Sequence, residues 1–155
     1  MAKSVLFLSS FNSARSQMAE GLLRALAGDA FEGYSAGSAP VDIHPLAVAA
    51  MAERGIDITG QRAKGLQEFI GSMQFDHVIT VCERDEKACP VFPGKGTREY
   101  WPVADPGRAE GSLEERLLHY HEARDYLEER TRRWLRERGY KQVLELSEAG
   151  ASTEV

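Results

Sequence analysis

The stretch Val5-Leu6-Phe7-Leu8-Ser9-Ser10-Phe11-Asn12-Ser13-Ala14-Arg15-Ser16 decides the fold of this chain. Its first four residues form a continuous apolar run, which is typical of a strand covered on both faces. The polar loop Ser9–Ser16 follows, and Leu22 and Leu26 then recur at helical spacing. This pattern predicts a buried strand, a tight loop and a helix over about 15–27.

The rest of the chain repeats this alternation of strands and helices. Apolar runs predict strands at about 31–35, 76–81 and 99–103, and helical spacing predicts helices at about 44–55, 66–73 and 114–138. Alternation of this kind predicts an α/β fold, a four-stranded parallel sheet with helices on both faces. No repeat or linker divides the chain, so we expect one domain over 1–148 and a flexible tail over 149–155. The expected core contacts of the later helices are Leu46, Ala49, Met51, Ala52, Leu117, Leu118, Tyr126, Leu127 and Trp134.

Composition excludes several classes of function. The chain has 155 residues, 43% of them apolar, and a formal charge of −5. A negative chain has no general attraction for nucleic acid or anionic membranes, so we expect neither as a partner. No apolar run approaches the ~18 residues that span a bilayer. The first apolar run is too short for a secretory signal, so a cytoplasmic location is predicted.

The two cysteines, Cys82 and Cys89, favour redox chemistry. A structural disulfide is unusual in a cytoplasmic protein, although two unrelated buried thiols are an equally simple interpretation of composition alone. The spacing Cys-x6-Cys does not suit a zinc site, and no histidine cluster lies nearby. We therefore expect no metal and no cofactor.

The loop after the first strand has the composition of an oxyanion site. In open α/β sheets, ligands bind beyond the carboxyl ends of the strands, where backbone N–H groups and a helix dipole favour anions. Arg15 can grip two oxygens of a tetrahedral anion, and Asn12 and Ser13 suit a tight loop. An ordinary capped loop with a solvent-facing arginine is the alternative.

The same stretch resembles the phosphate loop of the low-molecular-weight tyrosine phosphatase superfamily, Cys-x5-Arg-Ser. The continuation Gln17-Met18-Ala19-Glu20-Gly21 is similar to the arsenate reductase branch. The likeness runs from about Lys3 to Arg138. Further motifs that resemble the family are Tyr34-Ser35-Ala36-Gly37, His44-Pro45, Gly55-Ile56-Asp57-Ile58, Val81-Cys82, Ala88-Cys89-Pro90-Val91-Phe92-Pro93-Gly94 and Asp105-Pro106.

The resemblance implies a reaction and a role for each matching residue. A loop cysteine bonds to arsenate, Cys82 attacks that sulfur and releases arsenite, and Cys89 completes a disulfide that thioredoxin reduces. The segment between the cysteines must loop out for this bridge to form. Asp105 is implied as the general acid. The loop is expected to take arsenate, phosphate or sulfate through Ser10, Phe11, Asn12, Ser13, Ala14, Arg15 and Ser16.

One position departs from the family. Six residues before Arg15, where the family has its nucleophilic cysteine, this chain has Ser9. A nest of N–H groups and an arginine lower the pKa of a thiol, whereas a serine needs a dedicated base. We therefore predict a chain that is inactive as written. Ser9 is either an engineered replacement that traps a bound state or a natural change in a degenerate homologue, and the retained Cys82 and Cys89 favour the former.

Other functions stay open at this point. One alternative is a low-molecular-weight tyrosine phosphatase, but phosphatases of this fold lack the distal cysteine pair. A second is a non-catalytic oxyanion-binding homologue, which would explain Ser9. A third is a purely thiol-based redox protein, which would leave the loop unexplained. Asn12, Glu20 and Ser35 match positions that hold potassium in some family members. The fourth such position is an aspartate there and Lys64 here, so we expect its ammonium to occupy the cation's place.

Overall fold

The computed structural model describes residues 2–140 and 146. Within them the parallel sheet has the strand order β2-β1-β3-β4. The α/β class and the four-stranded parallel sheet predicted from the sequence are therefore confirmed. The tail expected over 149–155, and the stretch 141–145 before it, lie outside the described residues. The elements are β1 (Lys3–Ser9), α1 (Arg15–Ala27), β2 (Phe31–Gly37), α2 (Pro45–Ala52), η1 (Leu66–Glu68), β3 (His77–Thr80), β4 (Thr97–Tyr100), η2 (Pro106–Arg108) and α3 (Leu113–Glu137), where η marks a 3-10 turn.

Strand β1 lies between β2 and β3 and fixes where the loop and the cysteines meet. Leu8 is in register with Thr80 of β3, and Ser9 is in register with Gly37 of β2. Because these strands are parallel, their carboxyl ends share one edge of the sheet. Ser9 and Cys82, which follows β3 by two residues, therefore reach the same edge.

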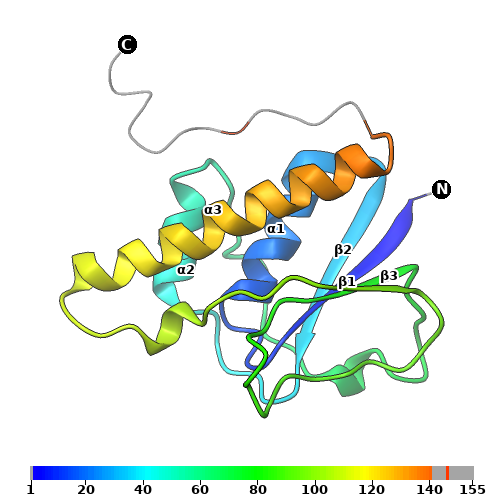
Figure 1. Cartoon of the computed structure of the whole chain (residues 1–155), viewed down its shortest axis with the longest axis horizontal. Coiled ribbons are helices and arrows are strands. Elements are labelled where there is room, and N and C mark those ends of the chain that lie inside the picture. The colour runs from blue at the N-terminus through cyan, green and yellow to red at the C-terminus, as the bar shows by residue number, and fades with distance from the viewer. Residues whose placement is uncertain (1, 141–145, 147–155) are drawn as a thin grey trace.

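The three α-helices pack together on one face of the sheet (Figure 1). Helix α1 contributes Met18 and Leu22, which are fully buried together with Phe7 of β1. Leu127 and Trp134 bring α3 onto the same core, as the sequence predicted. No helix among the described residues is long and apolar enough to cross a membrane.

Among the described residues, the opposite face of the sheet carries the 3-10 turn η1 and no α-helix, so the expectation of α-helices on both faces is corrected. Leu6 and Leu8 of β1 pack there against Phe69 and Phe75. The helix predicted over 66–73 is wrong beyond its first turn, since only η1 forms. Gly71 has φ 84°, a left-handed conformation that ends a helix. Phe69 is buried because it packs against the sheet. Its apolar side chain was therefore no sign of a helix.

The predicted helix faces need a correction. Ala49 and Ala52 are exposed, and Ala47 and Ala50 are buried in their place. In α3, Leu118 is 58% exposed and Tyr126 is 38% exposed. Helix α2 is apolar nearly all round, so composition could not identify the side that faces the core.

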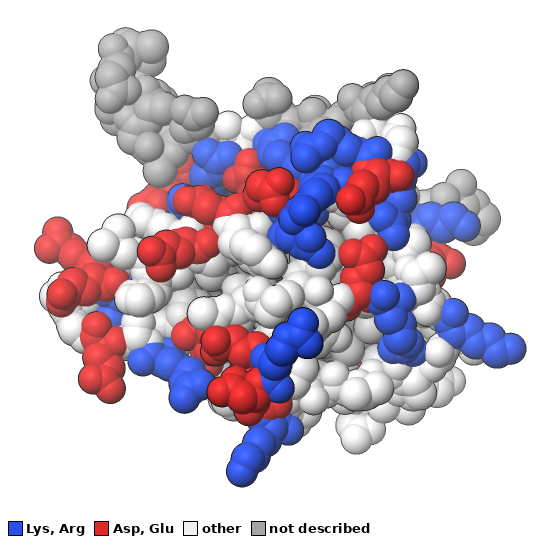
Figure 2. Space-filling view, in the orientation of Figure 1, with Lys and Arg blue, Asp and Glu red and all other residues white. Residues whose placement is uncertain are grey.

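The charges on α3 are divided along its length. Its first turn carries Glu114 and Glu115, and the side chain of Glu115 completes a capping box with Ser112. Figure 2 shows Lys and Arg side chains gathered over the opposite, C-terminal half of the helix. This distribution matches the helix dipole, which favours acids at the N-terminus and bases at the C-terminus.

Candidate active site

Backbone hydrogen bonds fix the conformation of the loop between β1 and α1. Asn12 has φ 49°, a left-handed conformation that asparagine tolerates. Three loop carbonyls accept hydrogen bonds from the chain after β2, which turns these oxygens away from the loop centre and favours inward N–H groups. The pairs are Ser10 with Ala39, Phe11 with Val41, and Ser13 with His44.

Gly37 makes this close packing of two backbones possible. A Cβ at this position would lie 2.7 Å from the carbonyl oxygen of Ser9 and 2.9 Å from the nitrogen of Asn12. No side chain fits at that separation. The family-like motif ending at Gly37 thus has a physical reason, which is to let the loop rest on the end of β2.

Ser9 begins the loop and has a hydroxyl as its partner. Its Oγ lies 2.6 Å from the Oγ of Ser16, and Nδ2 of Asn12 donates to that same Ser16 oxygen at 2.8 Å. All three residues are buried. Ser16 can therefore donate its proton to an anion at position 9, but a hydroxyl is no base for activating a serine.

A cavity of about 300 Å³ opens over the loop. Ser9, Arg15 and Asp105 all line it, so the structure brings together three predicted catalytic residues from distant parts of the chain. Oδ1 of Asp105 accepts from the N–H of Gly107 at 2.9 Å, which fixes the carboxylate at the start of η2. Oδ2 lies 3.9 Å from a guanidinium nitrogen of Arg15.

Of the remaining predicted site residues, Phe11, Ser13 and Ala14 also line this cavity, whereas Ser10, Asn12 and Ser16 do not. Phe11 has a side chain 39% exposed, and the Ser13 hydroxyl donates to the carbonyl of Asp42 at 2.9 Å. These two can contribute backbone groups only. The Ser10 hydroxyl donates to Glu86 at 2.6 Å and lies 3.9 Å from Sγ of Cys82.

Arg15 is buried and already has a carboxylate partner. Its two terminal nitrogens donate to the two carboxylate oxygens of Glu86, and the Nη2–Oε1 distance is 2.9 Å. It also donates to the carbonyl of Val103 at 3.0 Å. Burial opposes ionisation of Glu86, but hydrogen bonds from Arg15 and Ser10 lower its pKa to about 2. The sequence contained no signal for this contact, because Glu86 stands in a run of ordinary charged residues.

Cys82 and Cys89 form a disulfide, with Cα atoms 6.0 Å apart. Residues 83–88 contain turns and no helix. This agrees with the expectation that the segment loops out when the bridge forms. Cys82 is fully buried, and Cys89 is partly exposed.

His44 and Tyr120 also line the cavity, and sequence reasoning missed both as site residues. Their rings lie 5.0 Å apart. Burial and the nearby Arg116 lower the pKa of His44, while burial and the charge of Asp105 raise that of Tyr120. Both side chains are thus neutral at pH 7. Tyr120 lies in the middle of α3, where nothing in its neighbours distinguishes it from a core residue.

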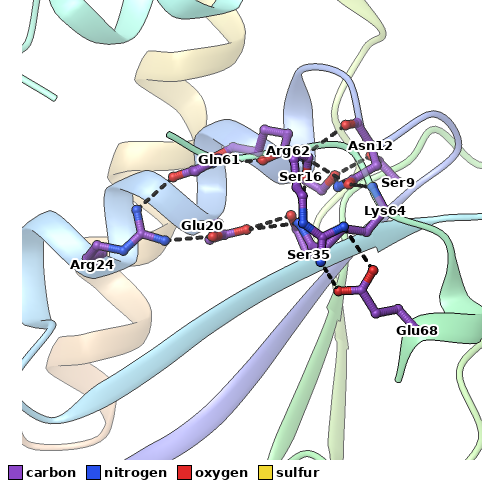
Figure 3. Close-up of polar contacts among 11 residues, drawn as sticks. Ser9, Asn12, Ser16, Glu20, Arg24, Ser35, Gln61, Arg62, Lys64 and Glu68 are labelled. Carbon is purple, nitrogen blue, oxygen red and sulfur yellow. Dashed lines mark hydrogen bonds and ion pairs between the residues drawn. The ribbon is translucent and has the colours of Figure 1, made fainter. Parts of the chain in front are cut away.

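Polar contacts link the four residues at the predicted cation position, which are Asn12, Glu20, Ser35 and Lys64 (Figure 3). Glu20 accepts from the hydroxyl of Ser35 at 2.7 Å and from Arg24 at 2.6 Å, and the Lys64 ammonium lies 3.9 Å from Glu20. Burial lowers the pKa of Lys64, and Glu20 opposes this effect. The backbone N–H of Lys64 donates to Oδ1 of Asn12 at 2.8 Å, which ties this cluster to the loop.

Comparison with known proteins agrees with this geometry. Residues 4–145 match the family model described as low molecular weight phosphotyrosine protein phosphatase. The arsenate reductase of Bacillus licheniformis is 40% identical over 132 residues, 85% of this chain and 94% of the relative.

Two solved structures extend the comparison. An arsenate reductase in its phosphate-binding state has TM-score 0.73 and 31% identity, covering 87% of this chain and 98% of its own. The thioredoxin-dependent arsenate reductase of Corynebacterium glutamicum has TM-score 0.63 and 29% identity, covering 88% of this chain and 61% of its own. The chain therefore belongs to the low molecular weight phosphotyrosine protein phosphatase family, and within it to the arsenate reductases.

Proposed function

We propose that this chain binds arsenate over the loop Ser10–Ser16 and carries the disulfide relay of a thioredoxin-coupled arsenate reductase, with its first step blocked at Ser9. The observation that carries the proposal is the Cys82–Cys89 bridge beside the loop, with Sγ of Cys82 3.9 Å from the Ser10 hydroxyl. A cysteine pair at this edge of the sheet has a use in reducing a bound oxyanion. It has none in phosphate-ester hydrolysis.

The reaction needs a thiol at position 9. That thiol would displace an oxygen of arsenate, and Asp105 would protonate the departing oxygen. Cys82 would then attack the sulfur, so that the sulfur–arsenic bond pair stays on arsenic and arsenite leaves. Cys89 would attack Cys82 in the resulting mixed disulfide, free the thiol at position 9 and leave the bridge seen here for thioredoxin to reduce. Each cycle moves two electrons from thiols to arsenic.

Ser9 stops this sequence at its start. Its hydroxyl contacts the hydroxyl of Ser16, so it has no base to remove its proton. We infer that arsenate, phosphate or sulfate binds reversibly. A cytoplasmic location fits a cysteine pair that must be reduced after each cycle, because thioredoxin keeps thiols reduced in that compartment.

The experiment is thioredoxin-coupled arsenate reduction by this chain and by Ser9→Cys. We expect the cysteine variant to exceed the parent by roughly a thousandfold or more, since removing a nucleophile costs about this much. A matched control is Ser9→Cys combined with Cys82→Ser, which should stop after one arsenate at most. Absence of turnover in Ser9→Cys would exclude the reductase relay in this chain.

A non-catalytic oxyanion-binding protein is the second candidate, and Ser9 itself favours it. This candidate requires that the natural gene encode serine at position 9, and that phosphate bind without being consumed. Hydrolysis of an aryl phosphate by Ser9→Cys, with no arsenate reduction, would instead indicate a phosphatase.

A further inference from the structure

The carboxylate of Glu86 accepts hydrogen bonds from Arg15, the residue that the proposed function assigns to oxyanion binding. Arg15 and Glu86 form a pair through two hydrogen bonds, the same geometry that arginine uses for phosphate and arsenate oxygens. The side chains are only 3% and 8% exposed. An incoming oxyanion therefore meets a guanidinium whose donors are already engaged.

Glu86 is held at this place by more than Arg15. Its Oε1 accepts from the Ser10 hydroxyl at 2.6 Å, and its Oε2 accepts from the backbone N–H of Glu83 at 2.7 Å. A residue of the loop and a residue of its own segment thus bind the same carboxylate. Four hydrogen bonds to one carboxylate make a complete anion site, filled from within the chain.

The disulfide fixes the segment that carries Glu86. The chain is anchored up to Cys82, because the N–H of the preceding Val81 donates to the carbonyl of Leu8 at 2.8 Å and Cys82 itself is fully buried. The bridge draws Cys89 back to within 6.0 Å of Cys82, measured between Cα atoms. Glu86 lies between the two cysteines, in turns held by weak backbone hydrogen bonds of 3.3 and 3.4 Å. Its position therefore depends on the bridge more than on local secondary structure.

We propose that Glu86 is an internal ligand of Arg15 that takes the oxyanion's place while the Cys82–Cys89 bridge is closed, so that the thiol state sets the affinity of the loop for oxyanions. Reduction by a dithiol adds two electrons and two protons, breaks the S–S bond and releases Cys89. The segment 83–88 then moves with Glu86, and Arg15 becomes free. This inference rests on the proposed function, since it assumes that the loop binds oxyanions.

The effect of this competition on the apparent affinity for an oxyanion can be estimated. If Arg15 is free in a tenth of the oxidised molecules, the apparent affinity for an oxyanion falls about tenfold. Coupling between two sites in one protein is commonly of this order. The oxidised product of a turnover would then reject a new oxyanion until it had been reduced.

The test is calorimetric titration of inorganic phosphate into the oxidised and the dithiol-reduced chain. Phosphate is suitable because thiols do not reduce it. We expect binding about tenfold weaker in the oxidised chain, and Glu86→Gln to strengthen oxidised binding about tenfold and so close the gap. Glu83→Gln removes the same charge from the same segment and should leave the gap in place.

A purely structural role for Glu86 predicts the opposite change in phosphate affinity. If Glu86 only orients Arg15, Glu86→Gln weakens phosphate binding in both states, and the proposal is overturned. Equal phosphate affinity of the oxidised and reduced parent chain overturns it as well. No phosphate binding by the reduced chain would instead reject the proposed function.

A second measurement needs no variant. Since coupling is reciprocal, an anion that binds the reduced chain tenfold more tightly raises the midpoint potential of the Cys82–Cys89 couple. The expected rise in saturating phosphate is about 30 mV. A midpoint potential unchanged by phosphate would overturn the proposal even if Glu86→Gln failed to fold.

Discussion

Two regions contact the loop between β1 and α1, and each places a charged side chain of the chain itself at a position where we predict that an ion could bind. In one region, Glu86 contacts Arg15 at the expected position of an oxyanion. In the other region, the ammonium of Lys64 lies 3.9 Å from Glu20, where we predict that it takes the place of a cation (Figure 3).

The two tethered charges differ in how they are attached. Lys64 follows a backbone that is fixed to the sheet, because its carbonyl accepts from Gly37 and its N–H donates to Asn12. Glu86 lies in turns closed by a disulfide that reduction opens. We therefore expect Lys64, on a fixed backbone, to stay in the ion's place. We expect Glu86, on a segment that reduction releases, to be exchanged for an oxyanion. The following changes would break or sharpen this difference.

Arg15→Lys should have the largest effect. Lysine keeps the charge opposite Glu86 but cannot form two parallel hydrogen bonds to an oxyanion. We expect phosphate binding by the reduced chain to weaken about a hundredfold, equivalent to one charged hydrogen bond. Titration calorimetry measures this. Binding within a factor of three of the parent would show that Arg15 is not the oxyanion ligand.

Gly37→Ala should disturb the scaffold that both regions share. The new Cβ would come within 3.0 Å of the loop backbone, so we expect a loss of about 1–3 kcal/mol in the free energy of unfolding. Gly60→Ala is the matched control, because nothing lies within 4 Å of a Cβ there. Denaturant melts of both variants compare the two effects. Equal free energies of unfolding for the two variants would mean that the loop can move to accommodate the new Cβ at position 37.

The stability of the oxidised chain should fall in acid through Glu86. Burial opposes its ionisation, but hydrogen bonds led by that from Arg15 lower its folded-state pKa to about 2, below the ordinary value of 4.5. A lowered folded pKa stabilises the chain above pH 4.5, and this contribution is lost as pH falls toward 2. We expect a loss of about 1–2 kcal/mol, smaller in Glu86→Gln. Melts from pH 6 to pH 3 test this, and identical pH profiles of parent and variant would contradict it.

Potassium should have the smallest effect. With the Lys64 ammonium beside Glu20, exchanging sodium for potassium should leave the melting temperature of the parent unchanged. Lys64→Asp should create a potassium-dependent rise, about 1.4 kcal/mol when potassium is at ten times its dissociation constant. Lys64→Gln removes the ammonium without adding a carboxylate and serves as the control. A rise in the parent would show that Lys64 does not take the cation's place.

Much of this site was predictable because it follows from local patterns. The apolar run before Ser9 and the leucine spacing after it predicted α1 with its observed bounds, Arg15–Ala27. Asp105 and the cysteine pair came from family motifs, and the structure places Asp105 beside Arg15 and bridges the cysteines. Their catalytic roles stay predictions until the Ser9→Cys experiment is done.

The errors share one physical cause. The helix predicted over 66–73 reduces to η1, because Phe69 and its neighbours are apolar through contact with the sheet. Likewise, Ala49 and Ala52 of α2 have the composition of a core face and yet are exposed. Apolar composition indicates that a segment is buried somewhere. It does not identify the partner against which the segment packs.

The sequence by itself determined the α/β class, the loop, the serine at position 9 and the cysteine pair, since each depends on neighbouring residues or on a motif. Only the tertiary structure decided that Glu86 binds Arg15 and that Tyr120 lines the cavity. Glu86 is 71 residues from Arg15 along the chain. Contacts of this kind form only when parallel strands bring their carboxyl ends to one edge, and no local pattern encodes which charges meet there.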